Sequence, residues 1–296
     1  VVTWCLLLSL ATYAPMHLAR GICSGNARFG SYGLIMGLDG AIRVLSCAAL
    51  WIAGVTNIGA YALTIALSPV VGVVIVALTG NLKTEDGPEA SWAEVTPNLG
   101  WLLLGSLFAA ALVNAGPITV DILGHDAPPE LVTRFGNAVI FARIPLFLFQ
   151  AVQAALLPRL ARLAAQRKLS EFKRGLQQLL VLVGSVGVLG TVGAFALGPW
   201  VLKLVYDGGI DRRTMTLLAF ASALYMLALA IAQAVIALNG HARVAIGWCA
   251  GFVAFALVAW LSSNDLYLRV ELALVASSLV SLAIFVASLR QKMSGN

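Results

Sequence analysis

Nine long apolar runs constrain the fold of this chain more than any other feature. An apolar run of about 20 residues is long enough to cross the hydrocarbon core of a bilayer. In lipid such a run must be a helix, because a helix satisfies its own backbone hydrogen bonds. The sequence therefore predicts an all-α integral membrane protein, a polytopic helical bundle with about nine transmembrane helices. The runs cover residues 1–18, 34–53, 58–78, 98–120, 135–157, 176–197, 215–238, 244–261 and 271–289.

The composition leaves no room for a sizeable soluble domain. The chain is 60% hydrophobic and 11% charged, whereas a soluble domain carries about 25% charged residues. Its net charge of +6 resides in short loops between apolar runs, so it is a signal of membrane topology. Nucleic-acid binding is disfavoured, because no folded basic module presents these residues.

The distribution of Lys and Arg predicts the orientation in the membrane. Alternate sides of the nine runs collect twelve and five of the 19 basic residues, and the richer side is normally cytoplasmic. The C-terminus is therefore expected in the cytoplasm. The twelve are Arg20, Arg28, Lys83, Arg159, Arg162, Arg167, Lys168, Lys173, Arg174, Arg243, Arg290 and Lys292.

An acidic, helix-poor stretch suggests a division into two parts. Residues 79–97 contain Glu85, Asp86, Pro88 and Glu89 and resemble a cytoplasmic linker. Residues 1–78 would then hold three helices and residues 98–296 six helices. This imbalance, with a first residue that is not Met, leads us to expect the later nine helices of a twelve-helix, two-lobe transporter.

No motif for catalysis, metal binding or cofactor binding accompanies these runs. The four Cys and three His are scattered, without CxxC spacing or neighbours at metal-ligand spacing. The chain lacks a phosphate-cradling glycine loop, a nucleophile elbow and a loop of clustered acidic residues. We therefore expect a protein that is not an enzyme and that uses no cofactor or metal.

The segment 141–158 combines features that are costly in lipid. It carries Arg143, Pro145, Gln150 and Gln153 within one apolar run. An arginine on a lipid-facing surface costs about 3 kcal/mol or more at this depth, so Arg143 should face the bundle interior or a wet cavity. A guanidinium there is suited to bind phosphate oxygens. Alternatively, Arg143 extends to the headgroups or pairs with a carboxylate for folding alone.

Asp39 and Arg43 stand four residues apart in the second run. This spacing places both on one helical face, in the order that favours an ion pair. The pair could direct Arg43 toward a central cavity, with Asp39 orienting it or exchanging with substrate or a coupling cation. A purely structural ion pair is the alternative.

Three amides are further candidates for substrate binding. Gln150, Gln153 and Asn114 lie inside apolar runs and could hydrogen-bond sugar hydroxyls in a cavity. The alternative is that they hold neighbouring helices together, as amides commonly do in membrane bundles.

Four stretches resemble bacterial polysaccharide-lipid flippases of the MATE-like MOP superfamily. Residues 20–33, RGICSGNARFGSYG, resemble the cytoplasmic loop after the fourth helix of those proteins. Residues 143–147, RIPLF, and 156–160, LLPRL, resemble their eighth helix and its exit. Residues 198–208 resemble a short interfacial segment in their C-terminal half.

The resemblance implies a specific transport function. It implies two six-helix lobes around a cationic cavity, with Arg43 and Arg143 as cavity residues. By alternating access, this cavity would pass a polyprenyl-pyrophosphate-linked oligosaccharide from the inner to the outer leaflet of the bacterial cytoplasmic membrane. The expected partners are that substrate, membrane lipids, and the polysaccharide polymerase and glycosyltransferases of the same pathway.

Two other functions remain open at this point. A MATE-type drug or metabolite antiporter would need membrane-embedded carboxylates for cation coupling, and only Asp39 lies well inside a run. An intramembrane enzyme of polysaccharide assembly would need a large outward loop or a paired acid and base. The sequence indicates neither the sugar nor the lipid carrier.

Overall fold

The computed structural model describes residues 1–84, 91–125, 128–206 and 209–294, without the side chains at 94–95 and 150–158. These residues form helices and no strands, and nine helical segments among them are long and apolar enough to cross a membrane. The expected all-α polytopic membrane fold is confirmed. The helices are α1 (Val2–Gly25), α2 (Phe29–Ile52), α3 (Ile58–Leu78), α4 (Trp92–Leu123), α5 (Pro129–Ala142), α6 (Ile144–Ala165), α7 (Leu169–Tyr206), α8 (Arg212–Ala237), α9 (His241–Leu261) and α10 (Leu266–Ser294).

The chain forms two compact units, Val1–Glu89 and Ala90–Asn296. Their boundary lies within the stretch 79–97 that the sequence indicates as a linker. Residues 85–90 of that stretch lie outside the described residues. The end of the stretch is helical, because α4 already begins at Trp92.

The first unit is a bundle of α1, α2 and α3, in which each helix contacts the other two. Their contacts are close because small residues meet the neighbouring backbone. A Cβ at Gly72 of α3 would lie 3.0 Å from the carbonyl oxygen of Ile35 in α2. The hydroxyl of Thr12 in α1 donates to the carbonyl oxygen of Ala66 in α3 over 2.6 Å. Such short contacts replace the hydrophobic drive that is lacking between helices in lipid.

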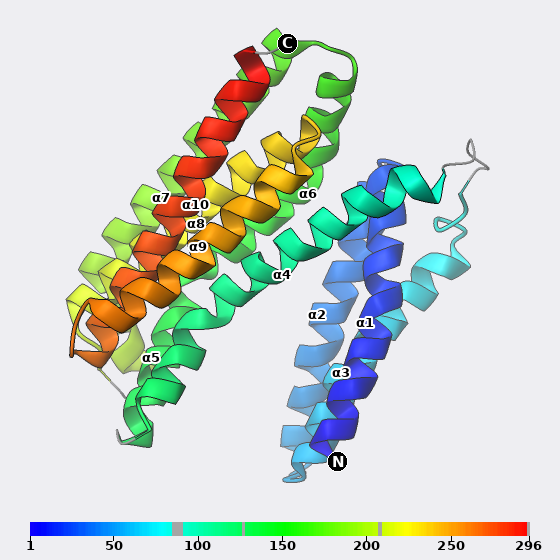
Figure 1. Ribbon diagram of the computed structural model, residues 1–296. Coiled ribbons are helices and arrows are strands. Elements are labelled where there is room, and N and C mark those ends of the chain that lie inside the picture. The colour runs from blue at the N-terminus through cyan, green and yellow to red at the C-terminus, as the bar shows by residue number, and fades with distance from the viewer. Residues whose placement is uncertain (85–90, 126–127, 207–208, 295–296) are drawn as a thin grey trace. The chain divides into compact units, whose positions relative to one another are not determined.

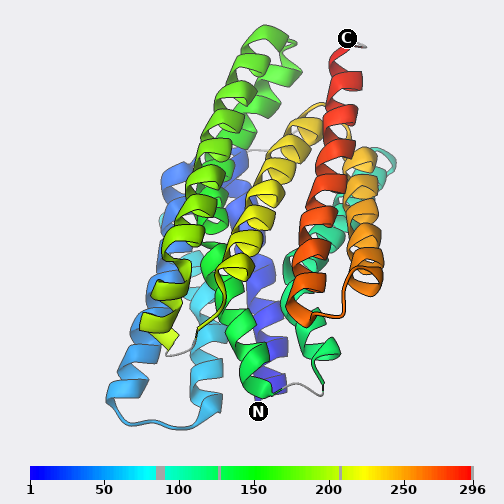
Figure 2. The same cartoon turned by 90° about the vertical axis from the view of Figure 1, so that its left-hand side faces the viewer.

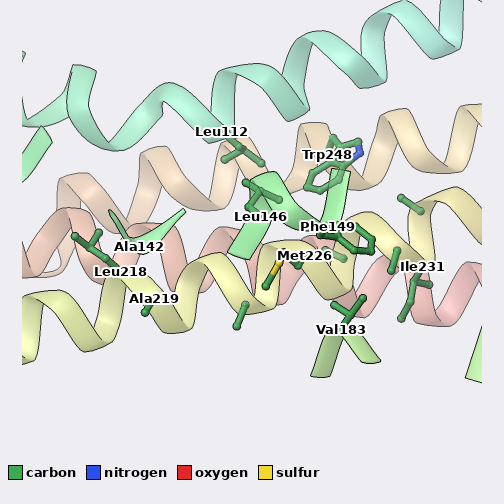
Figure 3. Packing of buried hydrophobic residues seen from close by; sticks show 14 of the residues in the cluster. Leu112, Ala142, Leu146, Phe149, Val183, Leu218, Ala219, Met226, Ile231 and Trp248 are labelled. Atoms are coloured by element: carbon green, nitrogen blue, oxygen red, sulfur yellow. The ribbon is translucent and has the colours of Figure 1, made fainter. Parts of the chain in front are cut away.

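The second unit is built around α8, which packs against α5, α6, α7, α9 and α10 (Figures 1 and 2). More than half of the residues of α8 are buried. Its many alanines let the neighbouring helices approach closely. Large side chains from the surrounding helices then fill the remaining space. Figure 3 shows Met226 of α8 within this core, together with Phe149, Val183 and Trp248.

The fifth apolar run consists of two helices that meet at Arg143. The run was expected as one span, but α5 ends at Ala142 and α6 begins at Ile144. Pro145 explains the break, because proline has no backbone N–H and its ring clashes with the carbonyl four residues earlier. The backbone N–H of Arg143 bonds to both Val139 and Ile140 at 3.2 Å. The break places an arginine where two helices join.

The prediction of a separate short interfacial segment at residues 198–208 is wrong. Residues up to Tyr206 continue α7, with Pro199 inside the helix. The helix is held there by packing, since Gly198 lies against Met215 of α8, 3.0–3.2 Å from the position of a Cβ. Residues 207–208 lie outside the described residues.

Candidate functional site

Arg143 lines a cavity inside the second unit. Its partly buried side chain shares the cavity with residues from α4, α5, α6, α8 and α10. The cavity itself is small, about 30 Å³, within about 430 Å³ of empty space that includes the part open to the surface. Ala142 and Leu146, close to Arg143 in sequence, contribute to its apolar lining together with Leu112 and Leu218. Figure 3 labels these four residues within the core.

The charge of Arg143 has no partner in the described part of the chain. None of the ion pairs among the described residues includes it, and no hydrogen bond to its guanidinium occurs there. A guanidinium carries five N–H donors and cannot be deprotonated in proteins. The cavity therefore offers a permanent cation with free donors, in a setting where bulk water provides little screening.

Hydroxyl groups provide the other polar part of this cavity. The hydroxyl of Tyr225 donates to the carbonyl of Ala109 at 3.1 Å, and that of Ser277 donates to Leu274 at 2.9 Å. The hydroxyl of Ser222 has no hydrogen bond within the described residues. Ser222 can thus donate to a ligand without breaking a bond, which adds a neutral donor to the donors of Arg143.

A second charged cluster lies in the first unit. The guanidinium of Arg43 holds both carboxylate oxygens of Asp39, with contacts of 2.7, 2.9 and 3.1 Å. The hydroxyl of Ser68 in α3 joins the pair, 2.8 Å from Asp39 and 3.0 Å from Arg43. The Arg43 guanidinium also lies 5.2 Å from the ring centroid of Tyr13 in α1. One ion pair on α2 is thus anchored to both neighbouring helices.

A buried carboxylate marks one end of the second unit. Glu271 of α10 is fully buried, and its Oε1 accepts from the Thr214 hydroxyl at 2.5 Å. The Oε2 atom has no hydrogen bond among the described residues and lies 3.6 Å from Arg213. Arg213 also approaches Asp265 at 3.4 Å, so its charge is shared between carboxylates. This cluster joins the start of α8 to the start of α10.

The structure brings some of the predicted site residues together and separates others. Asp39 and Arg43 form one cluster, whereas Arg143 belongs to the second unit and has a cavity of its own. Asn114 is exposed on α4, outside the Arg143 cavity, and donates to its own helix at Ala110 over 2.9 Å. The side chains of Gln150 and Gln153 lie outside the described residues.

Several residues of these sites escaped the sequence analysis. Tyr225, Ser222, Ser277 and Ser68 are common residue types inside apolar runs, and their spacing gives no signal. They become site residues only through the packing of α3, α8 and α10. A polar residue on the buried face of a predicted helix would have been a weak clue.

No metal centre is evident in the described ranges. Among those residues, no group of three or more His, Cys, Asp or Glu side chains is arranged to hold a metal ion.

The fold and the two sites define an integral membrane protein with the fold of MATE transporters. The chain superposes on a mutant of the Vibrio cholerae MATE transporter VcmN with a TM-score of 0.78, at 13% identity, over 96% of this chain and 68% of that one. For VcmN in its bent form the TM-score is 0.75, at 13% identity, over 98% and 69%. At this level of identity the likeness shows the fold alone.

Relatives by sequence come from mycobacteria. An uncharacterized protein of Mycobacterium tuberculosis is 27% identical over 96% of this chain and 65% of its own length. A second uncharacterized protein of the same species is 27% identical over 97% of this chain and 66% of its own length. The chain thus spans about two thirds of the length of these relatives. No protein-family profile matches it.

Proposed function

We propose that this protein is part of a membrane transporter that moves a polyprenyl-pyrophosphate-linked oligosaccharide from the inner to the outer leaflet by alternating access. The product would serve cell-surface polysaccharide biosynthesis. The MATE transporter fold supports a transporter. The charge of the cavity supports an anionic substrate group, which the pyrophosphate supplies.

The observation that carries the proposal is that the charge of Arg143 has no partner among the described residues. A partly buried arginine without a carboxylate keeps an unfavourable desolvation energy that an anion can relieve. Two parallel N–H donors of a guanidinium match two phosphate oxygens, and Ser222 can add a third donor. A cationic substrate would meet electrostatic repulsion in this cavity.

The rest of the assignment follows the distribution of charge. We propose that the basic side of the chain faces the cytoplasm of a bacterium, with the C-terminus on that side. The units 1–78 and 98–296 would each contribute to a lobe, joined through the linker 79–97. Arg43 would be a second phosphate ligand once Asp39 releases it. Gln150, Gln153 and Asn114 would contact the sugar.

A second candidate is a MATE-type drug or metabolite antiporter. It is favoured by Asp39, whose side chain is only 14% exposed, and by the buried Oε2 of Glu271, since embedded carboxylates can bind coupling cations. The solved structures with this fold are themselves MATE transporters. Arg43 saturates Asp39 through three contacts, which favours the first candidate.

Substitution of Arg143 tests the proposal. The complete protein that contains this chain would be reconstituted in vesicles that hold a fluorescent polyprenyl-pyrophosphate disaccharide. Transport would be measured as the fraction of the fluorescent lipid that an external quencher can reach. Hydrogen bonds to a charged group contribute about 1.5–3 kcal/mol, so R143A should lower the rate about 10- to 100-fold. R143K should retain part of the rate, because lysine keeps the charge but loses the paired donors.

The matched control is R134A, two turns earlier on α5. Arg134 is half-exposed and pairs with Glu130 at 3.6 Å, outside the cavity. Transport by R134A should equal that of the parent. Unchanged transport in R143A at equal protein level would exclude Arg143 as a ligand. Proton-driven efflux of a cationic dye, in place of lipid transport, would support the antiporter.

A further inference from the structure

A groove runs between α6 and α7 on the second unit. Its walls are mainly apolar, with leucines from both helices, and Gly175 of α7 opens it because no side chain fills that position. A Cβ at Gly175 would lie 3.5 Å from Leu160, in ordinary van der Waals contact. Arg159 and Gln178 are the polar residues of the groove. The groove therefore combines mainly apolar walls with one cation and one amide.

The end of α6 and the start of α7, beside this groove, carry a concentrated positive charge. Five of their six basic side chains have no ion pair within the described residues, and only Lys168 meets an acid, Glu171, at 4.0 Å. All six are exposed. This charge therefore remains available to an external anion. The six are Arg159, Arg162, Arg167, Lys168, Lys173 and Arg174.

The groove lies where the chain passes from charged to apolar sequence. The basic residues in the first turns of α7 end at Arg174, and the residues from Leu176 onward belong to the apolar run that crosses the membrane. At 1.5 Å per residue, Leu182 lies about 12 Å from Arg174 along the helix. A molecule in the groove would thus have its polar end at the membrane surface and its apolar end among the acyl chains.

We propose that this groove binds an anionic phospholipid of the surrounding leaflet. Its phosphodiester would contact Arg159 and accept a hydrogen bond from Gln178. One acyl chain would lie along the leucines beside Gly175. Basic pockets between transmembrane helices bind anionic headgroups in this manner. A free phosphate ion would leave the apolar channel unused, and a zwitterionic headgroup would bring its own cation next to Arg159.

Native mass spectrometry of the full chain would test the site, with phosphatidylglycerol and phosphatidylcholine of identical acyl chains as probes. The parent should retain one phosphatidylglycerol more tightly than phosphatidylcholine. R159Q should weaken this binding about fivefold, the effect of one basic residue near an anionic surface. G175L should weaken it as well, because the added side chain fills the channel while the charge is unchanged.

Two matched variants separate a site from general attraction. R290Q removes one charge near the end of α10, which lies at the same end of the unit as the connection between α6 and α7 (Figures 1 and 2). There Lys292 contacts Asn239, and Asn239 shares a cavity with Arg167. G175A adds only a methyl group. Both should bind like the parent. Equal losses in R290Q and R159Q, equal binding of the two lipids, or full displacement by inorganic phosphate would each overturn the proposal. Arg159 is exposed, so R159Q decides the question even where G175L does not fold.

Discussion

A double-mutant cycle on Asp39 and Arg43 separates a structural from a functional role of this pair. The substitutions are Asp39→Asn, Arg43→Gln and their combination. Both side chains are largely enclosed, with 14% of Asp39 and 30% of Arg43 exposed. Either single change removes the whole bidentate pair, since all three charged contacts join these two residues.

The magnitudes follow from burial. Removing one partner of a fully buried pair costs about 3–5 kcal/mol, because the other charge stays buried and uncompensated. Arg43 is partly exposed, so we expect about 2 kcal/mol for each single variant after discounting for solvent screening. The double variant leaves no unpaired charge and should also lose about 2 kcal/mol. The resulting coupling energy is about 2 kcal/mol, within the range for residues in contact.

The assay is reversible unfolding of the purified chain in mixed micelles, followed by circular dichroism at increasing denaturing detergent. S68A is a useful reference, because it removes one neutral hydroxyl from the same cluster and should lose about 1 kcal/mol. Additive losses, with a double variant near 4 kcal/mol, would refute the ion pair as the source of stability. A stable double variant that fails to transport would assign the pair a direct role in the transport cycle.

Two further predictions concern packing and pH. Replacing Gly187 by Ala should destabilise the chain by about 1–3 kcal/mol, because the added Cβ would lie 2.8 Å from the Cβ of Ala223. The control is Gly184→Ala, whose Cβ would meet nothing within 4 Å. Equal thermal stability of the two variants would contradict the α7–α8 contact. A hydrogen bond from the backbone N–H of Leu268, with help from nearby Arg213, lowers the pKa of Asp265 below 3.8. Asp265→Ala should therefore cost about 0.5–1 kcal/mol at neutral pH. This stability is present above the unfolded pKa and is lost as pH falls through the folded pKa, so a difference that persists once Asp265 is protonated in the folded state would exclude this origin.

Most of the architecture could be predicted from the sequence, because lipid leaves a membrane-crossing segment little choice of structure. Each of the nine apolar runs overlaps a helical segment that is long and apolar enough to cross a membrane. Their ends were less predictable. Apolar character stops at the lipid boundary, whereas α7 continues through Pro199 to Tyr206 because Gly198 packs on Met215.

The candidate sites were only partly predictable. The spacing of Asp39 and Arg43 indicated an intrahelical pair, and such a pair is present. The cost of a charge in lipid indicated that Arg143 needs a wet or internal location, and it lines a cavity. The roles of both arginines in transport stay predictions. Ser68 and Tyr225 gave no signal, because a hydroxyl inside an apolar run is ordinary until its neighbours are known.

The sequence by itself determined the class of the protein, since composition and run length require membrane-spanning helices whatever their arrangement. It also supplied Pro145, which favours a break beside Arg143, but the run was expected as one span and the structure revealed the break. Only the tertiary structure decided which polar groups meet. Arg143, Ser222 and Ser277 are far apart in sequence and share one cavity because α8 packs between α5, α6 and α10. That packing depends on the fit of small and large side chains across helices, which no local pattern encodes.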